Sequence, residues 1–61
     1  RPSEATLVGT RRLQGGPQGL SGRHAAHRRI LWAELPQGRW MEFQDVDLSQ
    51  AFALLEGLTV R

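Results

Sequence analysis

The sequence predicts a small, mainly β domain with a central hairpin, and three of its stretches support this prediction. Residues 5–13 read ATLVGTRRL, in which β-branched residues alternate with others. Residues 28–43 read RRILWAELPQGRWMEF, two apolar runs separated by Pro-Gln-Gly. Further on, VDLSQAFALLEGL is an apolar segment that begins with a good helix cap. We therefore expect a twisted sheet or small barrel with a hairpin over about 29–35 and 39–45, followed by one short helix or turn over about 48–56.

The first element is predicted to be a strand over 5–13, because β-branched residues favour strands and a Gly/Pro-rich stretch follows. Residues 1–4 are expected to be frayed. The stretch 14–23, QGGPQGLSGR, is predicted to be a Gly-rich loop. It lacks the lysine and the spacing of a phosphate-binding loop, so we interpret it as a connector.

The stretch around Pro36 has two interpretations. Residues 24–35 contain no helix breaker, and Ser21 and Pro36 suit the start and the end of a helix. In the other interpretation Pro36 and Gln37 form the corners of a type I turn, and Gly38 is a left-handed G1 bulge in a hairpin loop. We favour the hairpin because its register sorts the side chains onto two distinct faces.

One face of that hairpin would join the core and end in an ion pair. Its members are Leu31, Ala33, Leu35, Met41 and Phe43, with Arg29 opposite Asp45. On the other face each residue of one strand meets a partner of the other. These pairs are Glu34 with Trp40, Trp32 with Glu42, and Ile30 with Gln44. A slip of one residue would mix the two sets, so the pattern specifies the pairing.

The helix predicted over 48–56 has start and stop signals. Asp47 suits the N-cap, and Gln50 lies at the N3 position of a capping box. Apolar residues recur at helical spacing, and Gly57 suits the end. A single turn is the alternative, and 58–60 is predicted to add a short closing strand.

Size and composition limit the possible functions. A chain of 61 residues without cysteine makes one domain with a small core and no disulfide or thiolate zinc site. Such domains often gain stability by oligomerising, so we expect a homodimer. We interpret 1–61 as a single domain excised from a longer cytoplasmic protein. No apolar run approaches a membrane span, so we expect no membrane partner.

Charge is unevenly distributed. Residues 1–29 carry six arginines and one acidic residue (+5), whereas residues 30–61 carry two arginines and five acidic residues (−3), which gives the net charge of +2. The basic half is a candidate for contacts with nucleic acid phosphates, whether DNA or RNA. Its candidate residues are Arg11, Arg12, Arg23, Arg28 and Arg29. The alternative is a solvated surface that the acidic half offsets.

The face that carries both tryptophans is the candidate protein interface, because exposed aromatic pairs often mark contact surfaces. Its residues are Ile30, Trp32, Trp40 and Glu42. The alternative is that a loop or the C-terminal helix covers this face. If the tryptophans are exposed, a symmetric dimer contact is the first expectation, and stacking of unpaired bases is the second.

Catalytic and metal signals are weak. No serine lies in a G-x-S-x-G context, and cysteine and lysine are absent. His24 and His27 stand at i, i+3, but no third ligand is evident, so we interpret them as exposed loop residues. We expect no enzyme activity, no cofactor and no metal.

The order strand, long loop, tight hairpin, helical turn and last strand resembles that of SH3-like small barrels. Within that group, GRWMEFQDVDLSQAFALLEG resembles the C-terminal dimerisation domain of plasmid partition repressors of the KorB type. The resemblance implies self-association in a DNA-binding regulatory protein, with a role in plasmid partition or transcription regulation. Our expectation is therefore a non-catalytic interaction and oligomerisation module that pairs through its hairpin. The alternative is a nucleic-acid-binding domain that uses its arginines.

Overall fold

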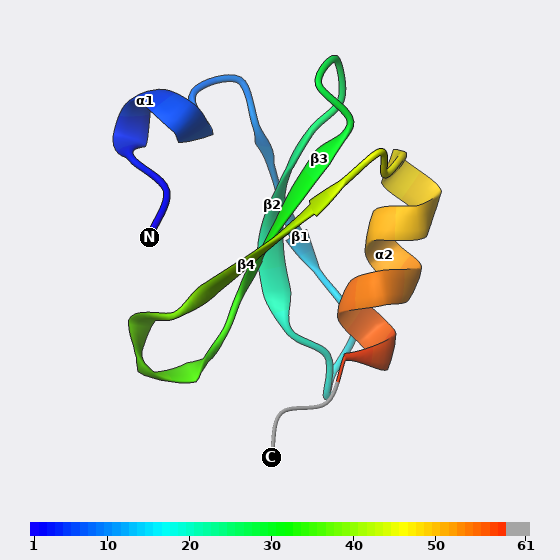
Figure 1. Cartoon of the computed structure of the whole chain (residues 1–61). Helices are drawn as coiled ribbons and strands as arrows, with labels where there is room; N and C mark the ends of the chain where they lie inside the picture. Colours follow the sequence, from blue (N-terminus) through cyan, green and yellow to red (C-terminus); the bar gives the residue numbers. More distant parts are fainter. Residues whose placement is uncertain (59–61) are drawn as a thin grey trace.

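The computed structural model describes residues 1–58, which form one antiparallel sheet with a helix packed on one face (Figure 1). In chain order its elements are α1 (Glu4–Leu7), β1 (Arg11–Gln14), β2 (Ser21–Ala25), β3 (Ile30–Glu34), the 3₁₀ turn η1 (Pro36–Gly38), β4 (Trp40–Gln44) and α2 (Leu48–Gly57). The four strands lie in the order β1-β2-β3-β4, so each pairs only with its neighbours in sequence. The mainly β prediction is confirmed. Over residues 1–58 the sheet is open, and closure into a barrel is not confirmed.

The central hairpin is confirmed in the predicted register. Leu31 pairs with Phe43, Trp32 with Glu42, and Ala33 with Met41. The Arg29 Nε atom lies 3.4 Å from Asp45 Oδ1, which closes the hairpin with the expected ion pair.

The turn of this hairpin differs from the prediction. Gln37 has φ 67° and ψ 31°, so it is left-handed instead of occupying the second corner of a type I turn. Gly38 also has positive φ, at 71°. Two consecutive left-handed residues reverse the chain here, and glutamine accepts the associated strain in an exposed loop.

The prediction of a strand over 5–13 is wrong for the first half of that range, where the chain forms the short helix α1. The Ser3 hydroxyl accepts a hydrogen bond from the Thr6 N–H at 3.1 Å and caps the short helix α1. Gly9, with φ 77°, then turns the chain, and β1 begins only at Arg11. Local capping at Ser3 outweighs the β-branched pattern in this segment, and it also orders part of the terminus that we expected to fray.

The predicted Gly-rich loop 14–23 is too long at both ends. Gln14 ends β1, and Ser21 already pairs with it to begin β2. The connection is tightened by a hydrogen bond from the Gly15 N–H to the Leu20 carbonyl at 3.0 Å. The residues of β2 have no apolar alternation, so their pattern does not predict a strand.

The core lies between the sheet and α2. Its buried members are Leu13, Leu31, Ala33, Val46, Ala51 and Leu55. Gly22 of β2 lets α2 approach closely, since a β-carbon there would lie only 3.2 Å from Leu55 Cδ2. We call the sheet surface under α2 the helix face. Of the apolar face predicted for the hairpin, Leu31 and Ala33 are buried, Leu35 and Phe43 are half-buried, and Met41 is exposed.

Helix α2 confirms the predicted capping box. The Asp47 carboxylate accepts from the Gln50 N–H, and the Gln50 side chain accepts from the Asp47 N–H, both at 2.9 Å. Leu58 is the C-cap residue of this helix, and the rest of the predicted closing strand over 58–60 lies outside the described residues.

His24 corrects another prediction. It was expected on an exposed loop, but it is only 3% exposed within β2, with its Nε2 atom 2.7 Å from the Val46 carbonyl oxygen. His27 is exposed, as predicted. The ring of His24 therefore ties β2 to the segment that leads into α2.

Candidate interaction surfaces of the hairpin

The sheet surface opposite α2 carries both tryptophans, and we call it the tryptophan face. Trp32 of β3 is only 5% exposed. Its indole N–H donates to Glu42 Oε1 at 3.0 Å, and Gln44 Nε2 donates to the other oxygen of the same carboxylate at 2.9 Å. Glu42, on the edge strand of the sheet, therefore provides the acceptor for the part-buried indole N–H of Trp32. Both of its carboxylate oxygens accept a hydrogen bond.

The cover over Trp32 comes from the N-terminal side of the chain, where α1 lies across the sheet from α2 (Figure 1). Arg28, in the turn between β2 and β3, places its guanidinium 5.3 Å from the centre of the Trp32 ring. The same guanidinium donates to the Thr6 carbonyl of α1 at 2.8 Å. Arg28 thus links the ring to α1 by a cation–π contact and a hydrogen bond.

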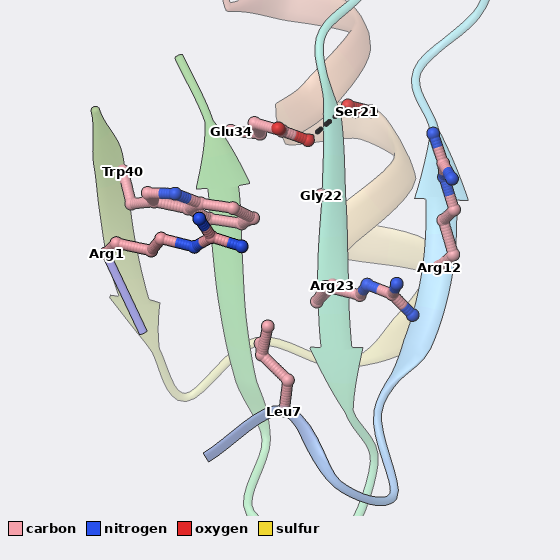
Figure 2. A pocket seen from close by; sticks show the side chains of 8 residues that line it. All are labelled: Arg1, Leu7, Arg12, Ser21, Gly22, Arg23, Glu34 and Trp40. Carbon is pink, nitrogen blue, oxygen red and sulfur yellow. Dashed lines mark hydrogen bonds between the residues drawn. The ribbon is translucent and has the colours of Figure 1, made fainter. Parts of the chain in front are cut away.

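Trp40 is half-buried and lies between two clefts on the tryptophan face. The first has a volume of about 230 Å³ and is lined by Arg1, Leu7, Arg12, Ser21, Gly22, Arg23, Glu34 and Trp40. We call it the arginine cleft (Figure 2). The second, of about 380 Å³, is lined by Arg1, Pro2, Ser3, Thr6, Trp32, Trp40 and Glu42. Both clefts lie between the N-terminal segment and the sheet.

The predicted interface residues therefore have different environments. Trp32 is buried, Ile30 and Trp40 are half-buried, and Glu42 is exposed. Of the two alternatives, the covered one holds for Trp32, because Arg28 of the β2–β3 turn lies over its ring, whereas the C-terminal helix packs on the other face of the sheet. The ring of Trp32 is thus not free to meet a partner while α1 stays in place.

The predicted nucleic-acid-binding arginines do not form one cluster. Arg12 and Arg23 are direct cross-strand partners on the tryptophan face. The side chain of Arg11 lies on the helix face, because neighbouring residues of a strand point to opposite faces. Arg28 lies over the Trp32 ring, and Arg29 forms an ion pair with Asp45. The arginine cleft adds Arg1, which the sequence did not single out.

β4 forms an open edge of the sheet, because no strand of residues 1–58 pairs with its outer side. The Leu35 N–H donates to the Arg39 carbonyl at 2.8 Å. This bond shows that the backbone groups of the odd-numbered residues from Arg39 onward are directed toward β3. Backbone groups of an antiparallel strand alternate between its two sides, so those of Trp40, Glu42 and Gln44 face outward. Over residues 40–44 this β4 edge contains no lysine, proline or bulge, and Glu42 is its single charged residue.

An exposed apolar residue lies beside this edge. α2 packs over β1 and β2, so the β4 end of the helix face is less covered. Met41 of β4 is 44% exposed there, next to the half-buried Phe43 on the same face. Backbone donors, acceptors and an apolar side chain therefore coincide along β4.

Other functional chemistry is sparse in the part of the chain that the structure describes. In residues 1–58, no three histidine or acidic side chains gather closely enough to hold a metal ion. None of the helices in this range has the length and apolar character to cross a membrane.

Comparisons with known proteins found no match among family models, curated proteins or solved structures. The function of this chain is therefore inferred from its own residues and their arrangement.

Proposed function

We propose that this chain is a non-catalytic interaction module that pairs with a second copy of itself through the β4 edge. The observation that supports the proposal is the coincidence of an unpaired edge, which has no lysine or proline over residues 40–44, with the exposed side chain of Met41. Two copies that align their β4 strands antiparallel would extend the sheet across a twofold axis. This contact replaces the tryptophan-face contact expected from the sequence, because Trp32 is already covered.

Backbone pairing supplies the directional part of such a contact. The outward N–H and C=O groups of Trp40, Glu42 and Gln44 would meet the same groups of the other copy. Side chains supply the apolar part, since Met41 and Phe43 would lie along the seam on the helix face. A small core also favours the second copy, because domains of this size bury a modest fraction of their surface alone.

The other sheet edge is less suited to symmetric pairing. β1 carries Arg11 and Arg12, both exposed. Two antiparallel copies of β1 would place like charges opposite or diagonal to each other, which opposes pairing. β4 would bring together only one pair of like charges, that of Glu42 with its copy, and both oxygens of each Glu42 carboxylate already accept hydrogen bonds.

The proposal includes the setting that the sequence resemblance implies, a DNA-associated regulatory protein. The basic charge of residues 1–29 supports this setting, because a positive surface favours proximity to nucleic acid. A relationship to SH3-like barrels belongs to the same proposal, with the small antiparallel sheet and tight hairpin as its support.

Analytical ultracentrifugation of the chain and of two lysine variants tests the pairing. Met41→Lys places a charge on the β4 seam, whereas Val8→Lys makes the same chemical change at a 75% exposed residue next to α1. We expect a dimer whose dissociation constant rises roughly tenfold or more in Met41→Lys, equivalent to about 1.4 kcal/mol, with no change in Val8→Lys.

A second pair of variants isolates the backbone contribution. Glu42→Pro and Glu42→Ala both lose the carboxylate, but only proline also removes an outward N–H that the β3–β4 ladder does not use, so we expect Glu42→Pro to weaken the dimer more than Glu42→Ala does. Circular dichroism checks that both variants fold. A wild-type chain that sediments as a monomer at high micromolar concentration contradicts the proposal, as does an equal effect of Met41→Lys and Val8→Lys.

A further inference from the structure

Within residues 1–58, two arginines that line the arginine cleft are cross-strand partners, and neither has an ion-pair partner of opposite charge. Arg12 of β1 and Arg23 of β2 are paired in register, so their β-carbons lie about 5 Å apart on one face of the sheet. The only ion pair in this range is that of Arg29 with Asp45. Like charges in direct opposition destabilise a sheet. An anion between the two guanidiniums would remove this repulsion.

The cleft around this pair has arginines on both of its sides and a single carboxylate at one end. In Figure 2, Arg12 and Arg23 lie on one side, Arg1 and Trp40 on the other, and Glu34 with Ser21 at one end. The Ser21 hydroxyl donates to Glu34 Oε2 at 3.2 Å, so the single carboxylate of the cleft is held toward that end. The charged lining is therefore three arginines against one glutamate.

Guanidinium pairs suit a phosphate group in particular. Arginine is planar and donates two parallel hydrogen bonds to phosphate oxygens, and two arginines can hold one phosphate from two sides. Trp40 adds a flat ring from a position two strands across from Arg23 and two residues along, so the two backbones are on the order of 12 Å apart. A phosphate joined through a sugar to a planar base has both of the features that these side chains recognise.

We infer that the arginine cleft binds single-stranded nucleic acid, with Arg12 and Arg23 on a phosphate and Trp40 against a base. A strand is favoured over a free nucleotide because a second cleft adjoins the first. The two clefts share Arg1 and Trp40, so the surface continues past the ring on both sides. Duplex DNA is a poor fit, since its bases are stacked away from a half-buried ring.

The site differs from the arginine cluster expected from the sequence. Of those five residues only Arg12 and Arg23 line the cleft. Arg11 lies on the other face of the same strand as Arg12 and is similarly exposed. It therefore serves as a control for a change of charge outside the cleft.

The test measures fluorescence anisotropy of a labelled thymidine oligonucleotide of about 12 nucleotides, at about 50 mM and about 200 mM salt. We expect Arg23→Gln to raise the dissociation constant about tenfold and Arg12→Gln with Arg23→Gln to raise it further, while Arg11→Gln changes it less than twofold. In the double variant the slope of log affinity against log salt should fall by about 0.7 for each phosphate that the protein no longer neutralises.

A second pair of variants tests the ring. Trp40→Phe keeps an aromatic surface and should retain binding within a few fold, whereas Trp40→Leu should weaken it about tenfold. Thermal melting of each variant shows that the chain still folds, so a loss of binding is assigned to the site.

Competition with inorganic phosphate and with thymidine monophosphate identifies the ligand. We expect both to displace the oligonucleotide only at far higher concentration than an unlabelled oligonucleotide does. If thymidine monophosphate displaces the labelled oligonucleotide as well as the unlabelled oligonucleotide does, the ligand is a free nucleotide and the proposal of a nucleic acid strand is wrong. Absence of oligonucleotide binding, or an equal loss in Arg11→Gln and Arg23→Gln, overturns the site itself.

Discussion

Trp32 and Glu42 are joined across the central hairpin, with the indole N–H donating to the carboxylate at 3.0 Å. The bond links a 5% exposed ring to an exposed residue on the β4 edge. It gives the ring a fixed orientation, and Arg28 lies over the same ring. The orientation of the buried Trp32 ring therefore depends on a residue that also lies on the proposed dimer seam.

The first prediction removes this acceptor. Glu42→Leu leaves the indole N–H without a partner in a largely buried position, which we expect to lower the free energy of unfolding by about 1–3 kcal/mol. Glu42→Gln keeps an oxygen acceptor and should retain most of that stability. Urea unfolding followed by tryptophan fluorescence measures both variants. Equal losses in the two variants would show that the hydrogen bond contributes nothing to stability.

The second prediction concerns the contact between α2 and the sheet. A β-carbon at Gly22 would lie 2.6 Å from the Trp32 carbonyl oxygen and 3.2 Å from Leu55 Cδ2. Backbone cannot move aside cheaply, so Gly22→Ala should destabilise the fold by about 1–3 kcal/mol or more.

Gly57 provides the matched control for this substitution. It ends α2, and a β-carbon there would meet nothing within 4 Å. Gly57→Ala should therefore leave stability unchanged or raise it by about 0.4–1 kcal/mol, because alanine restricts the unfolded chain. Thermal unfolding of the two variants side by side measures the difference. A Gly22→Ala variant as stable as Gly57→Ala would contradict the close packing of α2 on β2.

The third prediction uses the cap of α2. The pKa of Asp47 lies below its usual range, chiefly because the Gln50 backbone N–H donates to the carboxylate, with the Ser49 hydroxyl adding a second hydrogen bond. A carboxyl group whose pKa is depressed by folding contributes stability that is complete above its unfolded pKa, near about 4. This stability is lost as the pH falls through the folded pKa.

Asp47→Asn tests that contribution, because asparagine also caps helices but does not titrate. Urea midpoints recorded from neutral pH down to about pH 2 should fall more steeply for the wild type than for the variant below about pH 4. Above that range the two curves should run parallel. Parallel curves throughout the acid range would mean that Asp47 does not link α2 to pH.

Local signals in the sequence were enough to predict two parts of the fold. The alternation of residues on either side of Pro36-Gln37-Gly38 specified the hairpin register, because a shift by one residue would exchange its faces. Asp47 and Gln50 specified the start of α2, because a capping box needs only four consecutive residues. Both signals act over short separations, which a single sequence displays directly.

Other parts of the fold depend on segments that are distant in the chain. β2 carries Gly22 and His24, which lack an apolar pattern, and it becomes a strand because β1 and β3 pair with it on both sides. The burial of His24 depends on the Val46 carbonyl, 22 residues away. No local propensity reports such contacts.

The candidate surfaces divide in the same way. The sequence by itself determined that Trp32 and Trp40 share one face of a hairpin, because side chains of a strand alternate with period two. Only the tertiary structure decided that Arg28 lies over Trp32 and is bonded to α1, that Arg12 lies opposite Arg23, and that β4 is an open edge over residues 1–58. The physical reason is that burial and charge proximity are set by which segments pack together, whereas alternation is set by the backbone of each strand alone.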